Sequence, residues 1–210
     1  MSLPTVLFWE RRDVPGAEHV LFGDGFARGT VLAAEPVPFV CRYEVQTDPD
    51  QAAARAATRV DVRAEGAGWA RTVHLELAAG RWRVTGFEQG DLDAALVAAG
   101  HARAGRPGCD DPDQFYGAFD ASLAGSPFFR SLPVRRLGLP GAEAGVSHRI
   151  SVALILAPSL EVVQGDQIFT PLGGDRLRFA DETLSADLVC DPEGFVVDYP
   201  GLARRVTAAV

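Results

Sequence analysis

Apolar and polar residues alternate at every second position along much of this chain, which is the periodicity of a β-strand with one buried face. The alternation is clear in residues 39–45 and in residues 69–77, where Thr72, His74 and Glu76 share the face opposite to valine and leucine. One face of these segments is polar and the other is apolar. The pattern therefore predicts an antiparallel sheet with one face in water and the other packed on a core.

Turn sequences separate the alternating segments. Ala78-Ala79-Gly80 and Gly173-Gly174-Asp175 mark two hairpins, because glycine reaches the positive φ that tight turns require. Asp191-Pro192-Glu193-Gly194 is typical of a type I turn between two further strands. Residues 147–157 are apolar enough to form a buried strand that ends at Pro158. The template predicts about ten or more strands.

Two stretches depart from the strand pattern. Residues 91–103 predict a helix with an acidic first turn, and the alanine-rich residues 51–58 fit either a helical turn or a loop. No repeat, low-complexity tail or interdomain linker interrupts the chain. We therefore expect a single domain over residues 1–210, with a helix-containing insertion at about residues 90–116.

The composition is ordinary for a globular protein, with 47% hydrophobic and 23% charged residues. A chain of 210 residues buries enough surface to fold without a disulfide or a metal. The net charge of −8 argues against binding to nucleic acid, which requires clustered cations. All 20 basic residues are arginine, and this excludes a Schiff-base lysine mechanism.

The three cysteines, Cys41, Cys109 and Cys190, are odd in number and form no Cys-x-x-Cys pair. Cys41 and Cys190 lie inside alternating segments, where a reduced and buried thiol is expected. The start of the chain has no basic segment followed by an apolar run, and no stretch approaches about 18 consecutive apolar residues. We expect a cytoplasmic protein without a transmembrane segment, so a lipid ligand would be bound by the protein and the chain would not span a lipid bilayer.

No motif for catalysis or for a cofactor is recognisable. The four histidines form no His-x-x-x-His pair, and Asp110-Asp111-Pro112-Asp113 lacks the glycine and terminal glutamate of a calcium loop. The glycines of residues 23–29 miss the dinucleotide-binding spacing. The sequence therefore predicts no cofactor, no metal site and no nucleophile with a partner.

Trp9, Trp69, Trp82 and Tyr43 lie in predicted strands or at their ends. Inward rings on a curved sheet either fill a core, which is the more frequent case, or line a cup for an apolar ligand. Both interpretations use the same face of the strand, so both remain open.

Alternation does not account for the pair Arg135-Arg136. Adjacent side chains of a strand point to opposite faces of the sheet. If these residues form a strand, one of the two arginines must face inward or lie at the rim of the sheet. A buried guanidinium requires an acidic partner or a bound anion. An ion pair with Asp120 or Asp187 is the favoured interpretation, and contact with a ligand headgroup is the alternative.

Several short motifs, taken in order, resemble the putative glycolipid-binding family, which was formerly a domain of unknown function. They include Phe8-Trp9-Glu10, Gly80-Arg81-Trp82 and Leu132-Pro133-Val134-Arg135-Arg136-Leu137, and the resemblance covers nearly the whole chain. Ser122 replaces a family aspartate, and Phe129-Arg130-Ser131 replaces a Thr-Asn-Thr segment. The resemblance implies a strongly curved antiparallel sheet, an open half-barrel similar to bacterial lipoprotein carriers, with one or two short helices.

The sequence thus predicts a mainly β, non-enzymatic protein that binds an apolar or amphipathic molecule, a glycolipid or an acyl chain, in a β-shell cavity. The predicted ligand-binding residues are Arg135, Arg136, Trp9, Trp82, Tyr43 and Gln167. One alternative is an enzyme for a small hydrophobic substrate with Asp120 or Asp187 as its base. Another is a scaffold without a ligand, whose interior is filled by its own side chains. No feature of the sequence fixes an oligomeric state.

Overall fold

The computed structural model describes residues 4–47 and 56–206. Within these residues, one sheet contains 14 strands in the order β7-β6-β5-β4-β3-β2-β1-β14-β13-β12-β11-β10-β9-β8. Neighbouring strands run antiparallel, except for β8 and β9, which are parallel. The sheet is curved and does not close, so β7 and β8 are its edges. The mainly β, open half-barrel prediction is confirmed.

The first seven strands form one half of the sheet: β1 (Val6–Arg11), β2 (Gly16–Gly23), β3 (Phe26–Ala33), β4 (Phe39–Thr47), β5 (Ala57–Gly66), β6 (Trp69–Ala78) and β7 (Arg81–Gly90). The other half contains β8 (Asp120–Leu123), β9 (His148–Leu156), β10 (Glu161–Gly173), β11 (Arg176–Ala180), β12 (Ser185–Cys190), β13 (Val196–Tyr199) and β14 (Ala203–Arg205). The helical elements are α1 (Leu92–Ala98), the 3-10 turn η2 (Pro112–Phe115) and α2 (Pro127–Arg136).

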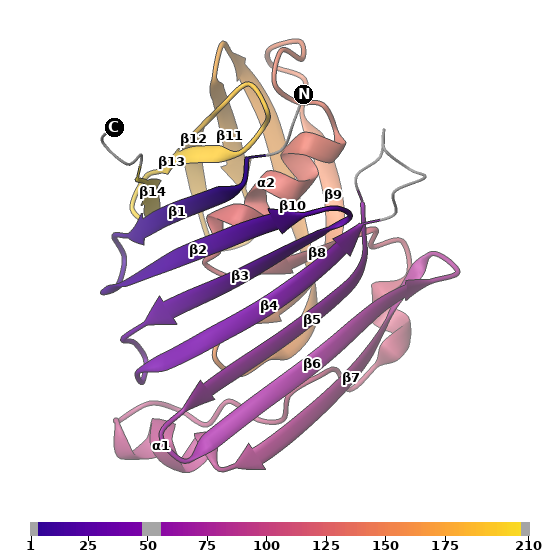
Figure 1. The fold of residues 1–210 in the computed structure, drawn as a ribbon. Coiled ribbons are helices and arrows are strands. Elements are labelled where there is room, and N and C mark those ends of the chain that lie inside the picture. Colours follow the sequence, from indigo (N-terminus) through magenta and orange to yellow (C-terminus); the bar gives the residue numbers. More distant parts are fainter. Residues whose placement is uncertain (1–3, 48–55, 207–210) are drawn as a thin grey trace.

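Helix α2 lies on the concave side of the sheet, between its two halves (Figure 1). Phe128 stacks on Tyr43 of β4 with ring centroids 5.6 Å apart, and it meets Phe22 of β2 edge-on at 5.8 Å. On the other side, the backbone amide of Val196 in β13 donates to Ser131 Oγ at 3.0 Å. Burial of each such aromatic side chain contributes roughly 1.5–3 kcal/mol, so α2 joins the two halves into one core.

The predicted hairpins are confirmed. β6 turns into β7 at Ala79-Gly80, β10 turns into β11 at Gly174-Asp175, and Asp191-Pro192-Glu193-Gly194 lies between β12 and β13. The buried strand predicted at residues 147–157 is β9.

The strand interpretation of Arg135-Arg136 is wrong, because both residues lie in the last turn of α2. Ser126 caps this helix by accepting a hydrogen bond from the Phe129 amide at 3.1 Å. Pro127 occupies the first turn, where its missing N–H costs no helical hydrogen bond. The wrong prediction has two causes. Because α2 is buried on nearly all sides, its sequence lacks the polar face that identifies a surface helix, and its two prolines resemble residues that end a strand.

The predicted helix at residues 91–103 is too long. Asp91 caps α1 through a 2.8 Å bond from the Ala94 amide, but the helix ends at Ala98, shortly before Gly100 at φ +83°. Both α1 and η2 fall within the predicted insertion. Of the alanine-rich stretch, residues 51–55 lie outside the described residues, and Ala57 and Thr58 begin β5.

Candidate functional site

Four of the predicted ligand-binding residues lie in the interior. Trp9 and Trp82 are 0% exposed, so no water-sized space touches them, and Tyr43 and Gln167 are only 4% and 2% exposed. Trp9 Nε1 donates to the Val196 carbonyl at 2.8 Å and thereby connects β1 to β13. These side chains act as core residues in this structure. Ligand contact at them stays a prediction that requires the interior to open.

The ion pair favoured for the Arg135-Arg136 motif is present. Arg136 donates two hydrogen bonds to Asp120, from Nε to Oδ1 at 2.9 Å and from Nη2 to Oδ2 at 2.6 Å. Asp120 is 4% exposed, so the arginine neutralises a buried carboxylate at the start of β8. Arg135 lies 3.9 Å from the Phe195 ring centroid and donates to the Glu193 carbonyl. Both arginines therefore have structural partners.

Asp187, the other predicted partner, lies elsewhere. It receives hydrogen bonds from Arg178 at 2.8 Å and from Arg176 at 3.3 Å on the exposed side of β11 and β12. The bonds from Arg178 hold its pKa below the ordinary value. Neither Asp120 nor Asp187 lines any of the open pockets described below.

A buried carboxylate that the sequence analysis missed lies at the N-terminus of α2. Glu18 of β2 is 1% exposed and accepts hydrogen bonds from the Tyr43 hydroxyl and from Ser126 Oγ, the latter at 2.6 Å. Burial raises its pKa to about 7, although these hydrogen bonds and the charge of Arg11 limit the rise. Glu18 Oε2 has no hydrogen-bond partner within the described residues. The sequence did contain a signal for this site. Glu18 lies two residues before the inward-facing Val20 in the same strand, so its side chain points to the same inner face.

Two departures from the family pattern meet inside the molecule. Arg130 Nη1 donates to Ser122 Oγ at 3.3 Å, and Gln167 Nε2 donates to the same oxygen at 3.2 Å. Arg130 also stacks 4.1 Å from the Phe179 ring centroid. Ser122 and Arg130 are 2% and 5% exposed, so this contact supports the packing of α2 on β8 and β10.

One open pocket lies beside α2 and has a volume of about 340 Å³. Its walls are mostly apolar and include Val134, Leu139, Pro140 and Leu177. Cys190 also lines it, and burial raises the pKa of this thiol to about 12, so the group is not a thiolate at neutral pH.

A larger depression of about 460 Å³ lies on the outer face of β2–β6, and we call it the polar hollow. Arg42 and Glu44 of β4 flank the inward-facing Tyr43, so they point away from α2. The lining side chains of this outer face are His19, Leu21, Arg28, Thr30, Arg42, Glu44, Asp61, Arg63, Thr72 and His74. The hollow thus presents hydrogen-bonding groups from five neighbouring strands.

Strand register aligns one residue from each of seven strands across this face. This central row consists of Phe8, His19, Thr30, Arg42, Arg63, Thr72 and Phe87. It contains no carboxylate, and an exposed phenylalanine stands at each end.

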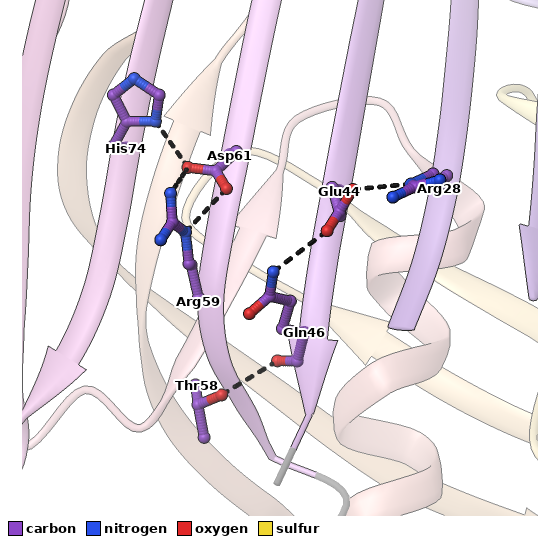
Figure 2. Close-up of polar contacts among 7 residues, drawn as sticks. All are labelled: Arg28, Glu44, Gln46, Thr58, Arg59, Asp61 and His74. Carbon is purple, nitrogen blue, oxygen red and sulfur yellow. Dashed lines mark hydrogen bonds and ion pairs between the residues drawn. The ribbon is translucent and has the colours of Figure 1, made fainter. Parts of the chain in front are cut away.

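The next row across the strands contains Arg28, Glu44, Asp61 and His74. Each of its two carboxylates is bonded to an arginine, as Figure 2 shows. Arg28 bonds Glu44 at 2.6 Å, and Arg59 bonds Asp61 at 2.8 Å. His74 Nδ1 lies 2.5 Å from the same Asp61. Bonds from Gln46 and Arg28 lower the pKa of Glu44. Partial burial of Asp61 opposes its ionisation, but the bonds from Arg59 and His74 outweigh this and lower its pKa.

Exposed apolar side chains adjoin the polar hollow. Val6 and Leu21 face each other across β1 and β2 and are each 47% exposed, and Phe8 is 42% exposed. We call these three residues the apolar rim. Leu21 also lines the hollow, so polar and apolar surfaces are continuous there. Such a surface fits a molecule with a polar head and an apolar part.

Two comparisons found similarity to known proteins. The model of the family described as "Putative glycolipid-binding" matches residues 6–205. The chain belongs to this family. A crystal structure of a DUF1089 family protein from Pseudomonas aeruginosa is similar in fold, with a TM-score of 0.66 and 24% sequence identity over 98% of this chain and 94% of that one. None of the functionally curated proteins matches the chain.

Two further observations concern the described residues only. They contain no helix that is long and apolar enough to cross a membrane. They also contain no group of three or more histidine, cysteine, aspartate or glutamate side chains that could hold a metal ion.

Proposed function

We propose that this glycolipid-binding family member binds the polar head of a glycolipid, or of a similar amphipathic molecule, on the outer face of β1–β6 without converting it. The observation that carries the proposal is the continuity of the polar hollow with the apolar rim. A volume of about 460 Å³ is within the usual range for a small-molecule site. Threonine, arginine and carboxylate groups would bind the hydroxyl groups of a sugar.

This proposal places the ligand outside the β-shell rather than within it. The interior position predicted from sequence is occupied by Phe128, Phe129 and the core tryptophans, all of which are at most 1% exposed apart from Trp69 at 4%. The outer face requires no rearrangement of the core before a ligand binds.

Binding is favoured over catalysis by the state of the carboxylates in the hollow. Hydrogen bonds from Gln46 and Arg28 lower the pKa of Glu44, and bonds from Arg59 and His74 lower that of Asp61. Each carboxylate is also paired with an arginine. A general base is most effective with a pKa near the working pH, so these two groups are poor bases at neutral pH. The cytoplasm is the compartment that the sequence predicts for this binding.

The test compares vesicles of phosphatidylcholine alone with vesicles that also contain galactosylceramide, in a flotation assay. We expect the protein to float only with the glycolipid-containing vesicles. Leu21→Glu adds a charge to the apolar rim and should reduce flotation about tenfold. Leu184→Glu is the matched control, because Leu184 is 40% exposed and lies outside the hollow and the rim. Flotation that Leu21→Glu leaves unchanged would contradict this location, and absent flotation with both galactosylceramide and its 3-sulfated form would contradict the function.

A further inference from the structure

A pair of like positive charges lies at the centre of the polar hollow. Arg42 of β4 and Arg63 of β5 are direct cross-strand partners. The Cβ atoms of two residues in such positions lie about 5 Å apart, and like charges there destabilise a sheet. The pair therefore requires a compensating negative charge.

Glu65 supplies part of this charge. Arg63 Nε donates to Glu65 Oε2 at 3.0 Å, and Arg42 Nη1 donates to Glu65 Oε1. These bonds lower the pKa of Glu65, so it is ionised at neutral pH. One carboxylate nevertheless faces two guanidinium groups, and the arginine side chains remain 56% and 49% exposed. One positive charge is left over on an accessible surface.

A second pair of outer arginines, Arg176 and Arg178, also shares one carboxylate, Asp187, but these two lie on one strand and outside the hollow. Elsewhere on the outer face, Arg28 is matched by Glu44 and Arg59 by Asp61 (Figure 2). When the bonded partners of the lining residues are included, four arginines (Arg28, Arg42, Arg59 and Arg63) stand against three carboxylates (Glu44, Asp61 and Glu65), whereas the whole chain has a net charge of −8. The hollow thus has a local charge opposite in sign to that of the molecule.

The neighbours of the pair are neutral donors. Thr30 lies next to Arg42 in the central row, and Thr72 lies next to Arg63. Two planar guanidinium groups with hydroxyl groups on either side match the geometry of an oxyanion, which accepts several hydrogen bonds at once.

We propose that Arg42 and Arg63 bind an oxyanion, a phosphate, sulfate or carboxylate group, that the polar head of the ligand carries. This inference rests on the proposed function and narrows it to anionic headgroups. The group would replace the missing counter-charge between the two arginines, and the head would extend along the central row.

The experiment uses three probes that differ in one feature each. Vesicles contain galactosylceramide or its 3-sulfated form in phosphatidylcholine, and inorganic sulfate or phosphate supplies the anion without a lipid. We expect the sulfated lipid to bind about tenfold or more tightly than the neutral one, because charge-assisted hydrogen bonds to the sulfate are added. Arg42→Gln and Arg63→Gln should each remove most of this preference. Arg178→Gln is the control, because Arg178 is similarly exposed at 54% but lies on β11.

The outcomes separate the two proposals. Equal binding of both lipids would overturn the oxyanion site and leave the proposed function intact. If neither lipid binds but inorganic phosphate or sulfate binds and Arg42→Gln abolishes this, the oxyanion site stands with a free anion as its source and the proposed function fails. If no probe binds, both proposals fail. Circular dichroism of each variant checks that the fold is retained.

Discussion

Glu18 and Glu44 are both glutamates on nearby strands, but their side chains lie on opposite faces of the sheet. Their pKa values are shifted in opposite directions from the ordinary value. Glu18 faces the core, where burial raises its pKa to about 7. Glu44 faces solvent, where bonds from Gln46 and Arg28 lower its pKa. The hydroxyl groups around Glu18 only partly replace the water that it loses. Access to water and to a cation, rather than the identity of the residue, decides the charge state.

The ion pairs of the two faces differ in the same way. Asp120 is nearly inaccessible to water and is bonded to Arg136. Arg28 is 62% exposed on its side chain, so water can replace Glu44 as its partner. Polar contacts of the inner face therefore determine the stability and position of α2 and the strands. Loss of a polar contact on the outer face should lower the stability only slightly. The side chains of that face are therefore available for a ligand.

The largest effect is expected from Arg136→Gln. It leaves the Asp120 carboxylate buried without its partner, and the free energy of unfolding should fall by about 3–5 kcal/mol. Urea denaturation measures this loss. The double variant Arg136→Gln with Asp120→Asn should recover part of the stability, because the uncompensated charge is gone. A loss below about 1 kcal/mol would show that the inner ion pair behaves like an outer one.

The next effect is a dependence of stability on pH that originates from Glu18. Its folded-state pKa of about 7 lies above the ordinary value of 4.5, so the folded chain retains a proton that the unfolded chain releases. The stabilisation is complete below pH 4.5 and is lost as the pH rises through 7, by about 3 kcal/mol in total.

Glu18→Gln should flatten the unfolding free energy over this pH range, whereas the wild-type protein should keep its slope. Chemical denaturation at a series of pH values measures both. A wild-type slope of zero in this range would mean that Glu18 is solvated in the folded state.

A smaller loss is expected from Gly29→Ala. A methyl group at Gly29 would overlap the Tyr43 ring, which stacks on Phe128, and would displace the Tyr43 hydroxyl from Glu18. Overpacking of this kind costs about 1–3 kcal/mol. Gly165→Ala is the matched control, because the nearest atom to its added methyl group would be at an ordinary 3.5 Å. Equal melting temperatures for the two variants would show that Tyr43 moves freely.

The smallest effect is expected from Arg28→Gln on the outer face. Its exposed ion pair with Glu44 should contribute less than about 1 kcal/mol, and even this should disappear at high salt. Comparison of urea midpoints at low and high salt tests it. A loss as large as that of Arg136→Gln would remove the distinction between the two faces.

Several features of the fold could be predicted from the sequence because they depend on short segments of the chain. Strand alternation and glycine turns depend on neighbouring residues, so the hairpins of β6–β7 and β10–β11 were recognisable. The Arg136–Asp120 pair was recognisable because a buried guanidinium requires a carboxylate, and few acids lie in apolar segments. The helix α2 was misassigned, since a helix buried on all sides lacks the amphipathic period that identifies a surface helix.

The sequence by itself determined which residues of each strand share a face, and therefore that the protein is an antiparallel sheet with one face in water. The curvature of the sheet was implied by the family resemblance and not by the alternation. Only the tertiary structure decided which residues of different strands meet. It brought Glu18 to the N-terminus of α2 and placed Arg42 opposite Arg63 in the polar hollow. The reason is physical: alternation is set by the backbone of one strand, whereas burial, pKa and local charge depend on neighbours that come from strands far apart in the chain.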